Sequence, residues 1–268
     1  MKFRITLQAT DKHRKLLPLN YQYPLSAWIY KTISEGNHAF AEFLHERGFE
    51  LGKKKFKLFT FSWLMIPAGS FRIEGDRLRL LDDTMHLDIS FLAPEAMQHF
   101  VAGLFQQQNF LLGDRVSQVP LQVVSMEALS LPTFRTVMRY RTNSPILVSR
   151  FVEGSKTASY LHPDEPMYSN LLIDNLIHKF ASALQAGMLA SVVDFGKDLQ
   201  GYELKILSEP KSKMMLIKAN TPQQTHIKAY HYDFELHAPE SLQRIGYITG
   251  FGEKNSLGLG SVEGDEKY

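Results

Sequence analysis

The sequence predicts an α+β protein in which the order strand–helix–strands–helix–strand occurs twice, once in each half of the chain. Two kinds of periodicity indicate this: apolar residues alternate in some segments and recur every three or four positions in others. The pattern also restarts around Ser130-Leu-Pro132, although the halves share no visible sequence repeat. The order is that of the ferredoxin-like (RRM-like) βαββαβ domain. We therefore expect two tandem domains, residues 1–130 and 131–268, with a glycine-rich loop near the C-terminus.

The N-terminal half begins with an alternating segment, residues 2–8, that predicts a strand. A helix follows over about 22–35, because Leu25, Trp28 and Ile29 have the spacing of one buried helical face. The further elements expected in this half are a helix over about 38–47, strands within 58–66, 71–81 and 85–91, a helix over 94–107 and a strand over 122–126.

The C-terminal half repeats this order with different residues. The elements expected are strands over 134–140 and 146–151, a helix over 165–184, strands within 204–207, 214–218 and 227–236, a helix over 241–248, and a last strand after the glycines. A four-stranded sheet of this kind is a common RNA-binding platform. The aromatic signature by which such sheets stack bases is absent, so we do not infer that mode of binding.

Composition excludes several classes of protein. The chain has 268 residues, of which 44% are apolar, and these suffice for two cores. Cysteine is absent, which excludes disulfides, thiolate metal sites and cysteine nucleophiles. No apolar run approaches the roughly 18 residues that a membrane helix needs, so we expect a cytoplasmic protein with no membrane partner. Residues 1–80 hold 14 basic and 7 acidic residues, a balance that suits a polyanionic partner.

Residues 246–264 contain six of the 17 glycines in the chain. Such a segment can present backbone N–H groups and Lys254 to an anion, most often a phosphate. A dinucleotide site or P-loop is excluded, because only four residues follow Gly264 and no βαβ unit can continue from there. The alternative that these glycines only form a turn before the last strand stays open.

Some polar residues are expected to point away from the cores. Helical geometry puts Tyr30 roughly 130° and His45 roughly 145° from the centres of the apolar stripes of their helices. His38 shares the polar face with His45, and geometry alone does not choose between them. Arg139 and Arg141 share one face of a strand and contact either solvent or phosphate.

Other chemistries lack their motifs. The sequence has no H-E-x-x-H, no zinc-ligand spacing and no G-x-S-x-G. His226, His231 and His237 fall in one strand-like region, but His231 and His237 are too far apart along the strand to bind one metal. We therefore predict no metal site and no cofactor.

Taken together, these segments resemble the CRISPR-associated repeat-processing endoribonucleases, the sixth numbered Cas family of the RAMP superfamily. The resemblance covers nearly the whole chain and is strongest over residues 18–46, 56–62 and 250–260. The tyrosine, histidine and lysine of the family's catalytic site fall on Tyr30 in Ile-Tyr, His45 in Leu-His-Glu and Lys57 before Leu-Phe-Thr.

The resemblance implies a metal-independent endoribonuclease that cuts CRISPR precursor RNA within its repeats, leaving a 2′,3′-cyclic phosphate and a 5′-hydroxyl. The insertion-like segment 49–55 leaves Lys53, Lys54 and Lys55 as competitors of Lys57. The residues expected to bind RNA are Lys53, Lys54, Lys55, Arg139, Arg141, Gly250, Gly252, Lys254, Asn255, Ser256, Gly258 and Gly260. Membership of a multi-subunit effector complex and a homodimer are left open. The alternative is a repeat-binding or structural RAMP subunit that does not cut.

Overall fold

The computed structural model describes residues 1–151, 158–189, 201–217 and 224–264. The elements of the N-terminal half are β1 (Lys2–Ala9), β2 (Leu16–Pro18), α1 (Gln22–Gly36), α2 (His38–Glu46), β3 (Phe49–Leu51), β4 (Lys54–Phe56), β5 (Phe59–Phe61), β6 (Phe71–Glu74), β7 (Arg77–Leu80), β8 (Thr84–Phe91), α3 (Pro94–Gln106), β9 (Asn109–Gly113) and β10 (Gln118–Leu129). Those of the C-terminal half are β11 (Val137–Thr142), β12 (Ser149–Arg150), β13 (Ser159–Tyr160), α4 (Tyr168–Gln185), β14 (Glu203–Ile206), β15 (Lys211–Ile217), β16 (Thr225–His231), β17 (Asp233–His237), α5 (Glu240–Thr249), the 3₁₀ helix η1 (Asn255–Leu257) and β18 (Val262–Gly264).

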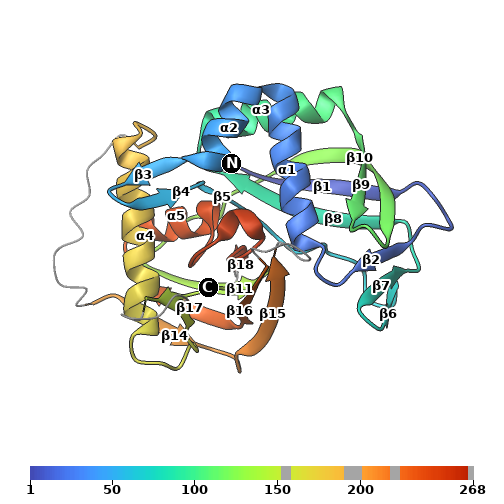
Figure 1. Cartoon of the computed structure of the whole chain (residues 1–268). Coiled ribbons are helices and arrows are strands. Elements are labelled where there is room, and N and C mark those ends of the chain that lie inside the picture. Colours follow the sequence, from blue (N-terminus) through green and yellow to red (C-terminus); the bar gives the residue numbers. More distant parts are fainter. Residues whose placement is uncertain (152–157, 190–200, 218–223, 265–268) are drawn as a thin grey trace.

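The N-terminal half forms an antiparallel sheet of order β5-β8-β1-β10-β9. Its first four strands have the order of a ferredoxin-like domain, and β9 adds a fifth at the edge. The alternating residues of β1 explain its central place, since Ile5 and Leu7 are fully buried. Helices α1 and α3 pack together over this sheet, where the rings of Trp28 and Phe100 meet edge to face with centroids 6.0 Å apart (Figure 1).

The C-terminal half forms a second sheet of order β14-β17-β11-β18, which is the ferredoxin-like order again. The predicted fold class is therefore confirmed. Its core contains Tyr140, Leu172, Phe234 and Phe251, contributed by β11, α4, β17 and the glycine-rich segment. The predicted domain boundary after residue 130 falls in the connection between β10 and β11, and the boundary itself stays a prediction.

The strand expected over 146–151 is shorter than predicted, since only β12, Ser149–Arg150, forms there. Two further segments also differ from the expectation. The segment 227–236 is not one strand, because it is interrupted at Tyr232, which lies between β16 and β17. The Tyr232 hydroxyl is buried against that of Tyr168, 2.6 Å away. This contact anchors the chain at the point where it passes from β16, which pairs with β15, to β17 in the main sheet of the C-terminal half. The segment 49–56 is a hairpin, β3–β4, in which Glu50 pairs with Lys55.

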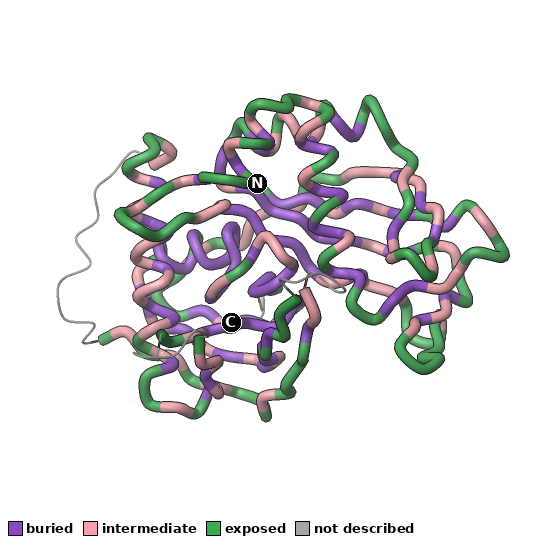
Figure 2. The backbone as a smooth tube through the Cα atoms, in the orientation of Figure 1, coloured by how far each residue is buried: buried purple, intermediate pink, exposed green. Residues whose placement is uncertain are grey.

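The two domains are joined by a buried seam next to the glycine-rich segment. Three polar side chains of the N-terminal domain donate to backbone carbonyl oxygens of the C-terminal domain, with bonds from Lys2 Nζ to Val262 (2.7 Å), Thr60 Oγ1 to Leu259 (2.9 Å) and Ser90 Oγ to Ile248 (2.8 Å). Figure 2 shows buried chain at this junction, where α5 lies against the N-terminal sheet. None of the described helices is long and apolar enough to span a membrane.

Candidate active site and nucleic-acid interface

Tyr30 and His45 come from consecutive helices and face each other. Asn37 ends α1 and caps α2, with its Oδ1 accepting the Phe40 N–H at 3.0 Å. This tight connection folds α2 back onto α1, so that the rings of Tyr30 and His45 meet edge to face with centroids 5.1 Å apart. His38, the alternative left open by the sequence, is an exposed residue at the start of α2.

Lys57 reaches the same place from the β3–β4 hairpin. Its Nζ donates a 2.6 Å hydrogen bond to the carbonyl oxygen of His45. Burial lowers the pKa of Lys57, the nearby Lys55 lowers it further, and Glu46 opposes both. The competing lysines lie elsewhere: Lys55 Nζ donates to the carbonyl oxygen of Glu46 at 3.3 Å, and Lys54 Nζ lies 3.2 Å from the His178 ring. Of these contacts, only that of Lys57 is made with His45 itself.

The two titratable rings have different environments. Burial raises the pKa of Tyr30 to about 12, and a hydrogen bond with the Ser256 side chain opposes that rise. The Tyr30 phenol is therefore neutral near pH 7 and suited to donate a hydrogen bond. The His45 side chain is 63% exposed, and its Nδ1 lies 2.7 Å from Glu46 Oε1. This contact occupies Nδ1, so Nε2 is the ring nitrogen that can exchange a proton with a ligand.

The glycine-rich loop (residues 250–260) folds around two buried side chains. Lys179 Nζ donates to the carbonyl oxygens of Gly250 (2.6 Å) and Gly252 (2.7 Å) and to Asn255 Oδ1 (2.7 Å). The Asn255 amide then donates to the carbonyl oxygens of Phe251 (3.1 Å) and Leu259 (2.9 Å). These carbonyl groups of the loop consequently point into its interior, toward Lys179 and Asn255.

This packing explains two of the glycines. Gly250 and Gly260 have φ values of +87° and +75°, which favour glycine. A Cβ on Gly250 would lie 2.5 Å from the Asn255 amide nitrogen, and one on Gly260 would lie 2.0 Å from the Phe251 carbonyl oxygen. Both glycines are thus required by the fold of the loop itself.

A cavity of about 480 Å³ separates this loop from β4 and β5. Five lysines and two acids line it: Lys54, Lys55, Lys57, Lys179, Lys254, Asp174 and Glu253. Ser149 holds the Glu253 carboxylate through its N–H at 2.8 Å and its hydroxyl at 2.9 Å. Within the described part of the chain, the N–H groups of Lys254, Asn255 and Ser256 donate to no other protein group. The cavity thus combines positive charge with free backbone donors, a combination that suits phosphate.

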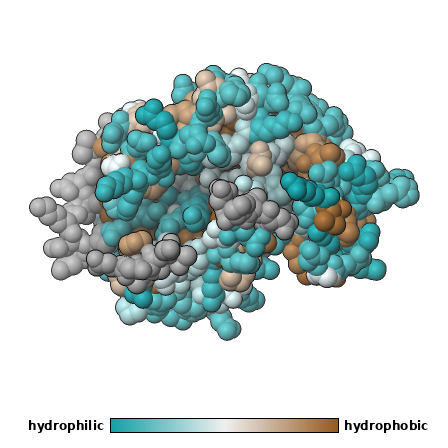
Figure 3. Space-filling view, in the orientation of Figure 1, coloured by the Kyte–Doolittle hydropathy of each residue, from teal (hydrophilic) through white to brown (hydrophobic). Residues whose placement is uncertain are grey.

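The cavity adjoins the Tyr30–His45 pair. Lys57, Phe59 and Ser256 line it and also contact that pair, with the Phe59 and Tyr30 ring centroids 5.6 Å apart. Figure 3 shows that the surface around β3 and β4 is mainly hydrophilic, whereas hydrophobic surface gathers over the end of the molecule that carries β6 and β7.

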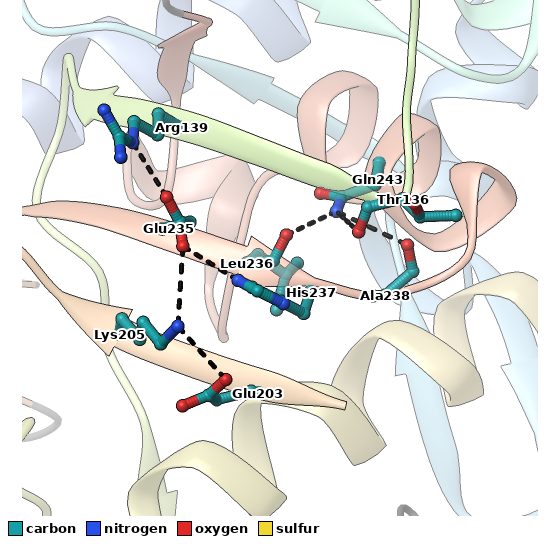
Figure 4. A network of polar contacts seen from close by, with 9 residues as sticks. All are labelled: Thr136, Arg139, Glu203, Lys205, Glu235, Leu236, His237, Ala238 and Gln243. Carbon is teal, nitrogen blue, oxygen red and sulfur yellow. Dashed lines mark hydrogen bonds and ion pairs between the residues drawn. The ribbon is translucent and has the colours of Figure 1, made fainter. Parts of the chain in front are cut away.

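Arg139 and Arg141 are not brought to this cavity. Both lie on β11 and pair with acids of β17: Arg139 Nε is 2.8 Å from Glu235 Oε2, and Arg141 Nε is 3.6 Å from Asp233 Oδ1. Figure 4 shows Glu235 between Arg139, Lys205 and His237. These contacts hold the pKa of Glu235 down at about 2, with His237 the first cause and Arg139 the second. Among the described residues, no group of three or more His, Asp and Glu side chains could hold a metal ion.

Sequence reasoning missed Lys179, which is 2% exposed and organises the loop. A signal was present, because Lys179 lies three residues after Leu176 and one before Phe180 on the buried face of α4. A lysine within an apolar helical stripe must find acceptors inside the protein. Ser26 was also missed: its hydroxyl donates to the Ser256 carbonyl oxygen at 2.6 Å.

Comparison with known proteins gives matches over both halves. Residues 16–121 match the model described as CRISPR-associated protein Cas6, N-terminal, and residues 129–264 match that described as CRISPR associated protein Cas6, C-terminal. The chain is 30% identical to "CRISPR-associated endoribonuclease Cas6 1" of Methanocaldococcus jannaschii, over 97% of this chain and 91% of the relative. It is also 30% identical to "CRISPR-associated endoribonuclease Cas6" of Pyrococcus furiosus, over 98% and 89% of the two chains.

Solved structures agree with the fold. The structure described as "CRISPR associated protein Cas6" superposes with a TM-score of 0.75 at 28% identity, covering 99% of each chain. That of a Cas6-related protein from Pyrococcus furiosus gives a TM-score of 0.78 at 22% identity, covering 100% of this chain and 99% of that one.

Proposed function

The chain belongs to the Cas6 family of CRISPR-associated endoribonucleases, and we propose that it cleaves CRISPR precursor RNA within each repeat to produce guide RNAs. The names of its relatives support the reaction class. The observation that carries the proposal is the meeting of Tyr30, His45 and Lys57 beside a cavity rich in lysine.

The proposed reaction is transesterification by the RNA's own 2′-hydroxyl. The 2′-oxygen attacks the adjacent phosphorus, the bond from phosphorus to the 5′-oxygen breaks, and the 2′-proton is lost while the 5′-oxygen gains one. The products are a 2′,3′-cyclic phosphate and a 5′-hydroxyl. The nucleophile is part of the substrate, so the reaction requires neither a hydrolytic water nor a metal-activated one.

Each side chain has a role that fits its environment. His45 exchanges a proton with the 2′-hydroxyl or with the leaving 5′-oxygen, which its exposed ring can reach. Tyr30, whose high pKa keeps it neutral, orients the 2′-hydroxyl through a hydrogen bond. Lys57 stabilises the additional negative charge of the pentacoordinate phosphorane.

The neighbouring basic surface would hold the RNA backbone. Lys54 and Lys55 of the β3–β4 hairpin and Lys254 of the glycine-rich loop supply positive charge to the lining of the cavity. Lys53 adds a further positive charge from the turn of the hairpin. Free N–H groups of the loop supply donors to phosphate oxygens. Arg139 and Arg141 already pair with Glu235 and Asp233, so each would contact a phosphate either in addition to its acidic partner or in place of it.

The test is to incubate the protein with the repeat RNA of its host, with and without EDTA, and to map the product ends. We expect cleavage at one position in both conditions, with a 5′-hydroxyl on the downstream product. A 2′-deoxy substitution at the nucleotide before the cut should stop the reaction. Cleavage of that substituted RNA would contradict the 2′-hydroxyl mechanism.

The same experiment distinguishes the alternatives. Tight, salt-dependent binding of repeat RNA without product would indicate a repeat-binding subunit. Binding with no preference for the repeat would indicate a structural RAMP subunit of an effector complex. The mass of the RNA-bound protein in solution would distinguish a monomer from a homodimer and from a larger assembly.

A further inference from the structure

Lys179 is a buried cation whose hydrogen-bonding capacity is filled by the glycine-rich loop. An ammonium group has three N–H donors, and Lys179 Nζ has three acceptors within 2.7 Å, all in this loop. An ion without acceptors would be very costly at such a position. Burial lowers the pKa of Lys179 to about 7, and the negative charge of Glu253 opposes that lowering.

From Lys179, contacts continue to the proposed catalytic tyrosine. The acceptor Asn255 is the first residue of η1, and its amide fastens the two ends of the loop through Phe251 and Leu259. The next residue, Ser256, accepts a hydrogen bond from the Ser26 hydroxyl through its carbonyl oxygen, and its side chain lies close enough to the Tyr30 phenol to oppose the rise in the pKa of Tyr30. The conformation of the loop therefore sets where the Ser256 side chain lies relative to the Tyr30 phenol.

We propose that Lys179 is a positioning residue for RNA cleavage, an internal cation that holds the glycine-rich loop in the conformation that places Ser256 against Tyr30. This inference rests on the proposed function. Lys179 does not act on the RNA directly, because all three of its donors are engaged and its side chain is buried. It acts by drawing the carbonyl oxygens of Gly250 and Gly252 inward.

A rival role for Lys179 is to stabilise the C-terminal core in general. A general role predicts that its removal lowers the melting temperature and leaves the cleavage rate of the folded fraction unchanged. A positioning role predicts a slower reaction in protein that remains folded. A misplacement of about 1 Å can cost roughly 100-fold in rate, so we expect a loss of about that size.

The experiment uses Lys179→Ala, with Lys179→Met as a second variant that keeps most of the volume and removes the charge. Single-turnover cleavage of the repeat RNA is measured at temperatures where melting curves show each variant to be folded. Hydrogen exchange of residues 250–260 is followed in the same samples. We expect slower cleavage and faster exchange that is confined to the loop, in at least one folded variant.

Chemical rescue supplies the control. Alanine at position 179 removes the atoms of a propylammonium ion, and Lys179 borders the cavity, through which a small amine can enter. n-Propylammonium should raise the cleavage rate of Lys179→Ala, 1-propanol should not, and neither should restore His45→Ala. Unchanged cleavage, or slow cleavage with unchanged exchange in the loop, would overturn the inference. If the wild-type protein itself does not cut repeat RNA, the proposed function fails, whereas the exchange measurement still tests whether Lys179 holds the loop.

Discussion

The ammonium of Lys57 donates a 2.6 Å hydrogen bond to the backbone carbonyl oxygen of His45. This contact links the end of the β3–β4 hairpin to the last turn of α2, two segments that are separated by 12 positions along the chain. It fixes a positive charge at the His45 backbone without using the imidazole ring. The β3–β4 hairpin, which contains the insertion-like segment 49–55, therefore brings Lys57 to His45.

The first prediction concerns the choice among the four lysines. Lys57→Met should slow single-turnover cleavage by about 10²- to 10³-fold, the loss typical of removing one group that stabilises a developing anion. Lys53→Met is the matched control, because Lys53 is exposed in the β3–β4 turn. It should weaken RNA binding slightly and leave the rate of the bound complex unchanged. A slow reaction in Lys53→Met together with a normal rate in Lys57→Met would instead assign the catalytic role to Lys53.

The second prediction concerns Tyr30. Burial raises its pKa to about 12, so the phenol stays protonated throughout the range in which RNA cleavage is measured. The pH–rate profile from pH 5 to 9 should therefore have the same shape in wild type and in Tyr30→Phe, with the variant slower at every pH. An inflection near neutral pH that disappears in Tyr30→Phe would show that the tyrosine acts as a base.

The third prediction concerns the backbone of the glycine-rich loop. Gly260→Ala should destabilise the protein by more than the 1–3 kcal/mol typical of backbone strain, because its Cβ would also overlap the Phe251 carbonyl oxygen. Gly75→Ala is the matched control: Gly75 has a similar φ of +63°, but nothing lies within 4 Å of its Cβ position. Urea unfolding of the two variants measures the difference. Equal losses would mean that the loop relaxes around the added methyl group.

The fourth prediction concerns the network of Figure 4. Hydrogen bonds from His237 and Arg139 lower the pKa of Glu235 to about 2. The folded-state pKa lies below the unfolded one, so this contribution to stability is present above about pH 4.5 and is lost as the pH falls toward 2. Glu235→Gln should therefore lower the melting temperature more at pH 6 than at pH 3. A difference from wild type that does not change with pH would contradict this.

Much of this fold could be predicted because its signals are local. The helices α1, α3 and α4 carry regular apolar stripes, and β1 and β8 alternate clearly, so these elements lie within a few residues of the predicted ranges. The hairpin β3–β4 could not be predicted, because its lysines give no alternation. Its position depends on packing against other elements, including contact of β3 with α4.

The candidate site divides in the same way. Tyr30 and His45 could be selected from helical geometry together with the family resemblance, since each lies off its own apolar stripe. Lys179 could not, because its partners lie more than 70 residues later in the chain and only the folded loop brings them together. Arg139 and Arg141 were correctly expected on one face of a strand, but the acids opposite them come from β17.

The most direct test of the central claim is the single-turnover rate of His45→Ala on repeat RNA in EDTA, measured together with its affinity for that RNA. We predict a loss of about 10²- to 10⁴-fold in rate, the contribution typical of a general acid–base group, with affinity close to that of wild type. The matched variant His38→Ala, at the other end of the same helix, should cleave normally. Cleavage by His45→Ala at the wild-type rate would contradict the account and move the search to His38.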